Sequence, residues 1–346
     1  MCKPKEEGYA LLLVIFAMTI LSVIFINLVE VIHVNNLLVR NNLNERELRL
    51  AAESGLVRGI KKLLTDDTLS DSYDDDWTKP FSGIAGRIAY EVTIEDIGSR
   101  LNINYTSYRI ISECLPWWKP SFQTELEKHG LCSELVSLRE ILGEDYPEAK
   151  KVLTTYGPFD LNLDRLEGIS KLLRLLGVGE AHAELIVDSL EELRAEGYVF
   201  KTVDELPLHV IGMDLLTFSK LKPHLTVIPR LNINFLSDDL ISAILKLSAL
   251  GLELTDERLE GLLAFLRENE IKNLAQIMGF FPMRDMEVLD RYFGVRSRYF
   301  LITADADSAG KGSFTLQTVV ERTSRNLVES ERNREWEVKI LRWLEK

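Results

Sequence analysis

The sequence predicts an α+β protein in which a long N-terminal helix packs on an antiparallel sheet and a large all-helical domain interrupts that sheet. Three observations predict this class. An apolar run near the N-terminus continues as a helical pattern, strand patterns occur near both ends of the remaining chain, and the residues between them have helical periodicity. The predicted parts are a leader at 1–8, the helix at 9–64, a discontinuous sheet domain at 65–104 and 297–346, and an inserted helical domain at 105–296.

The apolar run extends from Tyr9 to Leu28 and contains no charged residue. About twenty apolar residues in a helix cross the roughly 30 Å hydrocarbon core of a bilayer. The run is longer than the apolar region of a secretory signal peptide, and no small-residue cleavage site of the A-x-A type follows it. The helical pattern continues to Leu63 without a proline. The sequence therefore predicts one helix of roughly 55 residues, about 80 Å long, with its first half in the membrane.

The sheet is predicted from four strand-like segments. Residues 86–95 and 335–344 alternate apolar and polar side chains, residues 298–305 and 313–322 are two further predicted strands, and residues 308–312 form the predicted hairpin connection. Helices are predicted at 133–142, 165–176, 180–194, 240–250, 255–266 and from 274. Thr202 to Glu205 is a predicted capping box, and Ser237 a predicted N-cap. The strands flank the helical block, which predicts an insertion into one sheet.

The leader and the apolar helix together resemble the prepilins of type IV pili and type II secretion. In that family a prepilin peptidase cuts between a glycine and the first residue of the apolar helix, which are Gly8 and Tyr9 in this sequence. Lys3 and Lys5 place the leader in the cytoplasm by the positive-inside rule. A plain signal anchor is the alternative interpretation of this stretch.

The fifth mature position is Leu13, where prepilins usually have Glu. The resemblance implies that this Glu neutralises the free amine of the neighbouring subunit in a fibre, because a lone charge in lipid is costly. A subunit at the tip has no neighbour ahead of it and could do without the Glu. The K-type minor pseudopilin (general secretion pathway protein K) is the family member known for lacking it.

Further segments resemble the K-type family in the family's own order. They are residues 95–104, 200–206, 225–234 and 297–304. Two of them contain the recurring motif Leu101-Asn-Ile-Asn104 and Leu231-Asn-Ile-Asn234, whose asparagines most simply cap or turn the backbone. Tyr105 and Phe235 depart from the family, which usually has a small polar residue after the motif.

This resemblance implies a pilin-like fold with an inserted helical domain and a non-enzymatic role at the tip of the type II secretion pseudopilus. The implied partners are the I- and J-type minor pseudopilins, the other pseudopilins, the prepilin peptidase and the inner-membrane secretion platform. The implied location is the inner membrane, crossed once, with the body in the periplasm and an N-terminus that can be methylated.

The net charge is −13, which argues against nucleic acid as a partner because phosphate binding needs Lys and Arg. An acidic loop from Asp66 to Trp77 is most simply a solvated linker. No cofactor is required, but K-type relatives are known to bind calcium, and hard cations prefer carboxylates. The best candidates for metal ligands are Asp74, Asp76, Asp305 and Asp307, although the EF-hand order of ligands is absent.

Cys114 and Cys132 remain after loss of the leader, which contains Cys2. They could form a disulfide in an oxidising periplasm, or they could be two ordinary core thiols. The sequence leaves both alternatives open.

Residues 172–187 resemble a helix-hairpin-helix. In DNA-binding versions the hairpin offers backbone N–H groups and basic side chains to phosphate. Here Glu180, His182 and Glu184 follow the turn, which favours a packing role. Two other kinds of protein remain as alternatives. A membrane-anchored helix-hairpin-helix protein for DNA uptake would share the anchor and the hairpin, and a minor pilin of a type IV pilus would share the leader.

No enzyme motif occurs in the sequence. The five histidines are dispersed, and there is no H-E-x-x-H, C-x-x-C, G-x-x-x-x-G-K-[ST] or G-x-S-x-G. The sequence therefore predicts a protein without catalytic activity.

Overall fold

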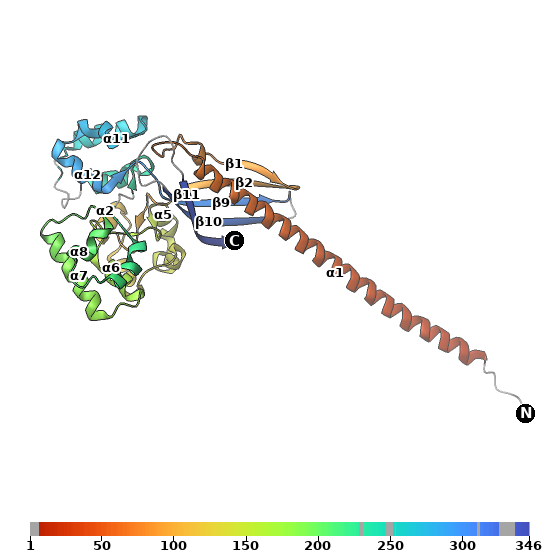
Figure 1. Ribbon diagram of the computed structural model, residues 1–346. Helices are drawn as coiled ribbons and strands as arrows, with labels where there is room; N and C mark the ends of the chain where they lie inside the picture. Colours follow the sequence, from red (N-terminus) through yellow and green to blue (C-terminus); the bar gives the residue numbers. More distant parts are fainter. Residues whose placement is uncertain are drawn as a thin grey trace, which may run out of the picture.

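A long helix, α1, extends from a five-stranded antiparallel sheet, and a helical domain lies at the other end of that sheet (Figure 1). The computed structural model describes residues 7–227, 231–246, 252, 254–309, 312–324 and 336–345. The predicted leader, apart from Glu7 and Gly8, lies outside these residues, as do parts of the predicted hairpin and of the helix expected up to residue 250. The predicted fold class, a long helix on an antiparallel sheet with an inserted helical domain, is confirmed.

The sheet has the order β1-β2-β9-β10-β11. Its strands are β1 (Phe81–Ala85), β2 (Ile88–Asp96), β9 (Tyr299–Asp307), β10 (Ser313–Ser324) and β11 (Trp336–Glu345). The helical domain is inserted between β2 and β9, which are neighbours in the sheet, with Val92 opposite Ala304. Four of these strands were predicted. Strand β1 was not, because five residues that include a glycine carry little alternating pattern.

Helix α1 (Glu7–Leu64) has two environments. Its C-terminal half packs on the sheet through buried Leu48, Ala51, Ala52, Leu56 and Leu63. Two glycines let helix and sheet approach closely. A Cβ on Gly59 would lie 2.8 Å from Ile302 Cγ2, and one on Gly55 would lie 3.0 Å from Val92 Cγ2. The small residues of α1 therefore set the distance between the helix and the sheet.

The inserted domain consists of three consecutive units, each closed by a short pair of parallel strands. Unit 1 runs from β3 (Leu101–Asn102) to β4 (Leu153–Thr154), unit 2 from β5 (Phe159–Asp160) to β6 (Leu225–Thr226), and unit 3 from β7 (Leu231–Asn232) to β8 (Phe293–Gly294). Parallel strands need a crossover connection, and helices supply it in every unit.

The helices of the units are short. Unit 1 contains α2 (Tyr108–Cys114), α3 (Pro120–His129), α4 (Arg139–Leu142) and α5 (Tyr146–Val152); unit 2 contains α6 (Leu166–Leu175), α7 (Glu180–Ala195), α8 (Leu206–His209) and α9 (Leu215–Leu221); unit 3 contains α10 (Asp238–Leu245), α11 (Asp256–Glu268) and α12 (Met286–Tyr292). Turns of 3₁₀ helix join them, including η3 (Gly143–Asp145), η8 (Leu274–Phe280) and η9 (Met283–Asp285).

The predicted caps are confirmed. Thr202 and Glu205 form the capping box, and Ser237 Oγ accepts a hydrogen bond from the Leu240 N–H. The segment predicted as a helix at 133–142 is instead a 3₁₀ turn followed by one α-helical turn. It stops at Gly143, which has a positive φ of 55°.

The same side-chain arrangement opens each unit. The second residue of the motif (Asn102, Asp160 or Asn232) accepts a hydrogen bond from the backbone N–H two residues later. The fourth residue then forms two hydrogen bonds with one backbone position further along: Asn104 with Cys132, Asn162 with Phe200, and Asn234 with Ile271. The structural role predicted for the two Asn motifs is therefore correct, and Phe159-Asp-Leu-Asn162 is a third copy.

Candidate functional site at the base of the anchor helix

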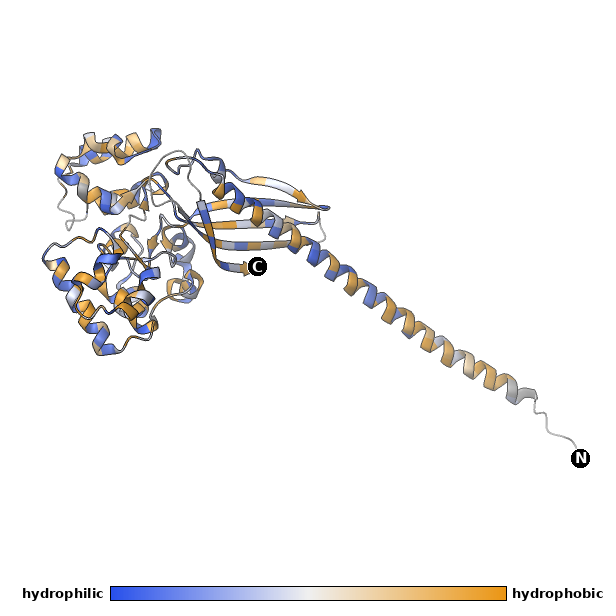
Figure 2. Cartoon of the chain, in the orientation of Figure 1, coloured by the Kyte–Doolittle hydropathy of each residue, from blue (hydrophilic) through white to orange (hydrophobic). Residues whose placement is uncertain are grey.

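The N-terminal half of α1 fits a membrane anchor. One 18-residue window of this helix has a mean hydropathy of 2.8, and none of the window is buried within the structure. Large apolar side chains project from it on all sides, and its outer half is predominantly hydrophobic in Figure 2. Thr19 and Ser22 donate their hydroxyl groups to the carbonyls of Phe16 and Met18, so their polar groups are satisfied inside the helix.

The predicted cleavage site lies in the first turns of α1. Gly8 and Tyr9 are both helical, and the Tyr9 side chain is 80% exposed. Leu13 is 62% exposed and contributes to the apolar surface, not to any polar site. Cleavage after Gly8 stays a prediction.

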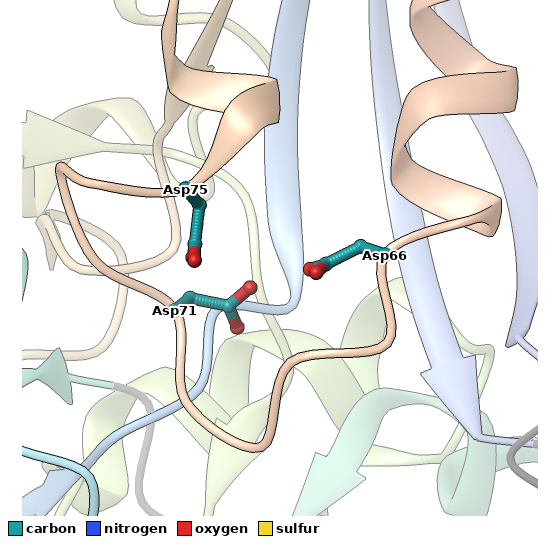
Figure 3. A group of neighbouring side chains, drawn as sticks. All are labelled: Asp66, Asp71 and Asp75. Carbon is teal, nitrogen blue, oxygen red and sulfur yellow. The ribbon is translucent and has the colours of Figure 1, made fainter.

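Three aspartates meet where α1 ends. Asp66, Asp71 and Asp75 belong to the loop that follows the helix, and oxygen atoms from all three lie within 4.8 Å of one another (Figure 3). Asp71 and Asp75 are buried, and the Asp66 side chain is 8% exposed. Within the part of the chain that the structure describes, this is the one such group of metal-ligating side chains. We name it the Asp66–Asp71–Asp75 cluster.

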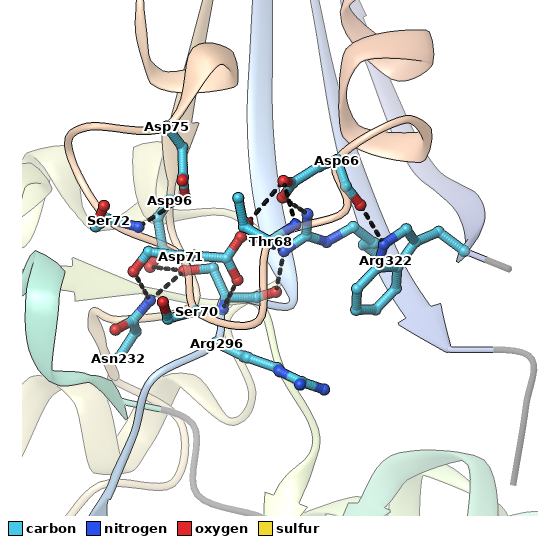
Figure 4. A network of polar contacts seen from close by, with 12 residues as sticks. Asp66, Thr68, Ser70, Asp71, Ser72, Asp75, Asp96, Asn232, Arg296 and Arg322 are labelled. Atoms are coloured by element: carbon cyan, nitrogen blue, oxygen red, sulfur yellow. Dashed lines mark hydrogen bonds and ion pairs between the residues drawn. The ribbon is translucent and has the colours of Figure 1, made fainter. Parts of the chain in front are cut away.

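Arg322 of β10 supplies the positive charge of the cluster. Its Nη1 lies 2.7 Å from Asp66 Oδ2, and its Nη2 donates to Asp71 Oδ1 (Figure 4). The guanidinium is 1% exposed and lies over the rings of Phe300 and Trp336, at 4.8 and 4.6 Å from their centroids. A planar guanidinium can bind two carboxylates at once, which an ammonium group does less well.

The cluster is part of a network that joins the sheet domain to unit 3. Asp71 Oδ2 accepts a hydrogen bond of 2.7 Å from the Ser297 N–H, and the Asp71 carbonyl accepts one of 2.9 Å from Asn232 Nδ2. Ser297 Oγ donates to Asp96 at the end of β2, at 2.7 Å. These bonds connect the end of α1, the entry to the inserted domain and the exit from it (Figure 4).

Burial dominates the electrostatics of these acids. It raises the pKa of Asp71 to about 6, although the Arg322 guanidinium opposes that shift. Burial also raises the pKa of Asp75 and of Asp96; hydrogen bonds from Ser99 and Ser297 oppose the shift at Asp96. Because burial makes the charged form of Asp71 costly, the ionised carboxylate depends on the neighbouring Arg322 guanidinium for stabilisation.

The cluster as arranged does not fit a calcium ion. Calcium takes six to eight oxygen ligands, whereas two of the three carboxylates here are already bonded to a guanidinium in the same space. The chain therefore supplies its own cation at this position.

The predicted metal residues lie elsewhere and are not gathered into one site. Asp74 is exposed, and Asp76 is exposed and pairs with Lys62 at 2.9 Å. Asp305 and Asp307 are both on β9, where Asp305 accepts a hydrogen bond from the Thr315 hydroxyl. Calcium binding by these four residues remains a prediction.

The two cysteines are free and lie in the same hydrophobic core of the helical domain. Burial raises the pKa of Cys114 to about 12 and also raises the pKa of Cys132, so both thiols are poor nucleophiles. Their pairing in an oxidising compartment remains a prediction.

The predicted hairpin is formed by α6 and α7, with Gly177 at a φ of 80° in the turn. Glu180 pairs with Arg174, and Glu184 and Asp188 are exposed on α7. An acidic helix after the turn would repel phosphate. The core residues Leu172, Ile186 and Leu190 show that the hairpin packs unit 2.

Among solved structures, this chain is similar to one chain in "The Crystal Structure of the GspK-GspI-GspJ complex from enterotoxigenic Escherichia coli Type 2 Secretion System". The identity is 15%, the match covers 89% of this chain and 96% of that chain, and the TM-score is 0.33. Values this low establish neither the family nor the function. No protein-family model matches the sequence, and no curated protein matches it. The family assignment is therefore a proposal based on the chain's own residues.

Sequence reasoning missed Arg322, Asp66, Asp71 and Asp75 as a group. The acidic loop was recognised, but Arg322 is 256 positions away from Asp66, and no local pattern connects them. One signal could have helped: Arg322 lies two residues after Val320 and so on the same strand face, and an arginine on an apolar face must find carboxylates nearby.

Proposed function

We propose that this chain is a K-type minor pseudopilin, a non-enzymatic subunit at the tip of a type II secretion pseudopilus that helps to initiate its assembly and protein export. Tyr9 to Leu28 anchors the precursor in the inner membrane, with one crossing and the body in the periplasm. Prepilin peptidase removes residues 1–8, and the new N-terminus at Tyr9 is a site for methylation.

The two-part helix α1 carries this proposal. One half is exposed and apolar, and the other half is buried on an antiparallel sheet. A protein that only needed an anchor could use a span joined to its body by a linker. Here the same helix continues rigidly into the folded body, so that neighbouring helices can replace lipid around its apolar half while the body keeps a fixed orientation.

The tip position is supported by two features. With Leu13 at the fifth mature position, the helix lacks the acid that would neutralise the free N-terminal amine of a subunit ahead of it. The inserted domain, residues 105–296, adds bulk beside the sheet (Figure 1), which fits the end of a fibre better than its tightly stacked interior.

The proposed partners are the I- and J-type minor pseudopilins, with the other pseudopilins, the peptidase and the inner-membrane platform engaged during assembly. Coexpression of the full chain with I- and J-type subunits tests this. We expect the three proteins to purify as one complex in mild detergent. Recovery of the chain alone, under conditions in which the I- and J-type subunits bind each other, would contradict the proposal.

The Leu13→Glu variant tests the tip position. We expect impaired assembly, because the new carboxylate has no amine ahead of it to neutralise it in lipid. Pseudopilus formation in a strain that carries the variant is the measurement, with Leu12→Met as the matched control. Normal assembly with Leu13→Glu would remove this support for the tip position.

DNA uptake is the competing function. The charges of the hairpin disfavour it, because α7 presents Glu184 and Asp188 to solvent. A gel-shift experiment with duplex DNA at low salt discriminates between the two functions. We expect no shift at micromolar protein, whereas a salt-sensitive shift would favour the DNA-uptake protein.

A further inference from the structure

Unit 2 exposes an unusual number of large aliphatic side chains in one short segment. Between residues 208 and 216, the exposed fractions are 78% for Leu208, 60% for Ile211, 77% for Leu215 and 68% for Leu216. Val210 and Met213 of the same segment, and Leu206 and Leu221 on either side of it, belong to the core. The exposed residues are therefore additional to those that the fold of unit 2 uses.

Helix α7 extends this surface. The Ile211 N–H donates to Ser189 Oγ at 2.9 Å, and His182 Nε2 lies 2.5 Å from the Gly212 carbonyl, so the segment lies against α7. Leu185, which is 45% exposed, has a methyl carbon 3.1 Å from the position that a Cβ on Gly212 would take. We define the 208–216 patch as Leu185, Leu208, Ile211, Leu215 and Leu216.

Unit 1 does not repeat this surface, and unit 3 repeats it at one position only. Equivalent positions in the three units can be found by counting back from the closing strand of each unit. The positions of Leu215 and Leu216 before β6 correspond to Gly143 and Glu144 before β4 in unit 1. In unit 3 they correspond to Met283 and Arg284 before β8. The architecture of a unit thus accepts Gly, Glu or Arg at these positions, although Met283 of unit 3 is itself 81% exposed. Clusters of exposed apolar residues on a soluble surface commonly mark interaction sites.

The border of the patch is acidic. Glu184 and Asp188 flank Leu185 on α7, and neither makes an ion pair with a described residue. Glu191, Glu192 and Glu196 continue this acidic surface, whereas the nearby bases His182 and Lys222 are paired with Asp214 and Asp204. Lys201 and Lys220 are too few to balance these carboxylates.

The location of the patch separates it from the anchor. Helices α7 and α8 lie at the end of the molecule that is remote from the N-terminus of α1 (Figure 1). An anionic lipid surface is disfavoured by this distance and by the carboxylates around the patch. A second copy of the chain is disfavoured as well, because the same acidic border would face itself across a two-fold interface.

We propose that the 208–216 patch docks a helical segment of a partner protein, with an apolar face that covers the five aliphatic side chains and with Lys or Arg residues that meet Glu184 and Asp188. In such recognition the apolar face of an amphipathic helix provides affinity, and the charges provide orientation and rate. The site is separate from the helix surface on which the proposed pseudopilin role depends.

The test uses the full chain in nanodiscs of neutral lipid and two synthetic 18-residue helical peptides. Both peptides carry the same leucine face, one with flanking lysines and the other with flanking glutamates. We expect saturable binding of the lysine peptide, at least tenfold tighter than that of the glutamate peptide and weaker in high salt. The Leu208→Ser/Leu215→Ser variant should lose at least tenfold in affinity for the lysine peptide.

Two controls make the result decisive. The matched variant Leu175→Ser removes another highly exposed leucine of unit 2, outside the patch, and should bind as the parent chain does. The Glu184→Gln/Asp188→Gln variant should lose the preference for lysine. The proposal would be overturned if both peptides bound equally or if neither bound. It would also be overturned if Leu175→Ser lost as much affinity for the lysine peptide as the patch variant does. Binding of anionic vesicles, or self-association that the patch variant abolishes, would assign the patch to lipid or to a second copy and would also overturn it.

Discussion

Arg322 shows at the scale of one residue how distant parts of the chain depend on each other. Its guanidinium is buried between two aromatic rings and bonded to two aspartates of the loop after α1. A buried ion pair is a weak source of net stability, but removal of one partner leaves an uncompensated buried charge. The network is therefore sensitive to loss of this arginine.

The Arg322→Ala variant should unfold more easily at neutral pH, by about 3–5 kcal/mol, because Asp66 and Asp71 lose their counter-ion. Urea unfolding of the full chain in nanodiscs measures the change. Arg87→Ala is the control, because Arg87 also pairs with an acid, Glu47 at 2.7 Å, but its side chain is 75% exposed. We expect less than about 1 kcal/mol from the control. Equal effects of the two substitutions would contradict the role of Arg322.

Without Arg322 the cluster becomes three carboxylates within reach of one cation. Millimolar calcium should then restore part of the lost stability of Arg322→Ala by binding at the cluster, an effect that the parent chain should not show there. Melting temperatures with calcium and with a chelator provide the comparison. Calcium stabilisation of the parent chain that does not depend on Arg322 would point to a separate metal site, such as the predicted Asp74, Asp76, Asp305 and Asp307.

The stability of the chain should depend on the protonation of Asp71. Its folded-state pKa of about 6 lies above its ordinary value of 3.8, so the folded protein binds this proton more tightly than the unfolded chain does. The contribution of Asp71 is fully present below about pH 4 and is lost as the pH rises through about 6. The stability of the parent chain relative to Asp71→Asn should therefore fall between pH 4 and 7. A rise over this range would mean that the ion pair with Arg322 outweighs burial.

The aspartates of the loop were visible in the sequence, but their environment was not. A run with six acids between residues 66 and 76 has the composition of a solvated linker. In the structure, Asp71 and Asp75 are buried while Asp74 and Asp76 are exposed. The burial of Asp71 goes with its ion pair to Arg322 of β10, a long-range contact that composition cannot supply.

At the scale of elements, α1 was the most predictable part, because a continuous apolar run and an uninterrupted helical period both act locally. Its glycines were less informative from the sequence alone. In the structure Gly55 and Gly59 lie where the helix approaches β2 and β9 most closely, so their lack of a side chain determines the packing distance.

Gly59→Leu should destabilise the sheet domain by about 1–3 kcal/mol, because even a Cβ at this position lies 2.8 Å from Ile302. The control is Val57→Leu on the same helix, at a side chain that is 64% exposed, and it should change the stability by less than about 0.5 kcal/mol. Thermal unfolding of both variants in nanodiscs provides the test. No loss of stability in Gly59→Leu would mean that α1 does not pack on the sheet at this distance.

The three units of the inserted domain were only partly predictable. Leu101–Asn104 and Leu231–Asn234 share their four residues, so the repeat was visible, but Phe159-Asp-Leu-Asn162 keeps only the final Asn. The structure shows why the substitutions are allowed. Asp160 accepts the same backbone hydrogen bond as Asn102, and Phe159 fills the same buried strand position as Leu101.

Asn232 should contribute more stability than an exposed asparagine, since it is fully buried and its amide nitrogen donates to the Asp71 carbonyl and to Ser297 Oγ. Asn232→Leu should cost at least about 2 kcal/mol, because several buried polar groups lose their partners. Asn269→Leu, at an exposed side chain, should be nearly neutral. Hydrogen exchange should also show faster opening around residues 295–299 in Asn232→Leu, and equal behaviour of the two variants would contradict this.

At the scale of the whole molecule, the inserted domain leaves the sheet intact because its two ends meet. The backbone N–H groups of Ile97 and Gly98 both donate to the Tyr299 carbonyl, at 3.0 and 3.1 Å. The chain thus leaves β2 and returns to β9 at one point, beside the cluster at the base of α1. Strand patterns on both sides of a helical block predicted this insertion, whereas the network that secures it could not be predicted.

The organisation of the whole chain has a consequence for function. Helix α1 runs without a break from its apolar half to the sheet, and the hydrogen bonds of Asp71 with Asn232 and Ser297 join the loop after α1 to the helical domain. Under the proposed function, these connections would transmit the orientation of the apolar half of α1 to the body. This is the property that a subunit of a helical fibre needs and a simple anchored protein does not.

The most direct test of the proposed function is the position of the mature N-terminus. The full chain is coexpressed with a prepilin peptidase, and the product is sequenced from its N-terminus beside a Gly8→Leu variant and a peptidase-free control. We expect Tyr9 as the first residue, with or without a methyl group, only when Gly8 and the peptidase are both present. A product that still begins at Met1, or one cut at another position, would reduce α1 to a plain anchor and contradict the assignment as a pseudopilin.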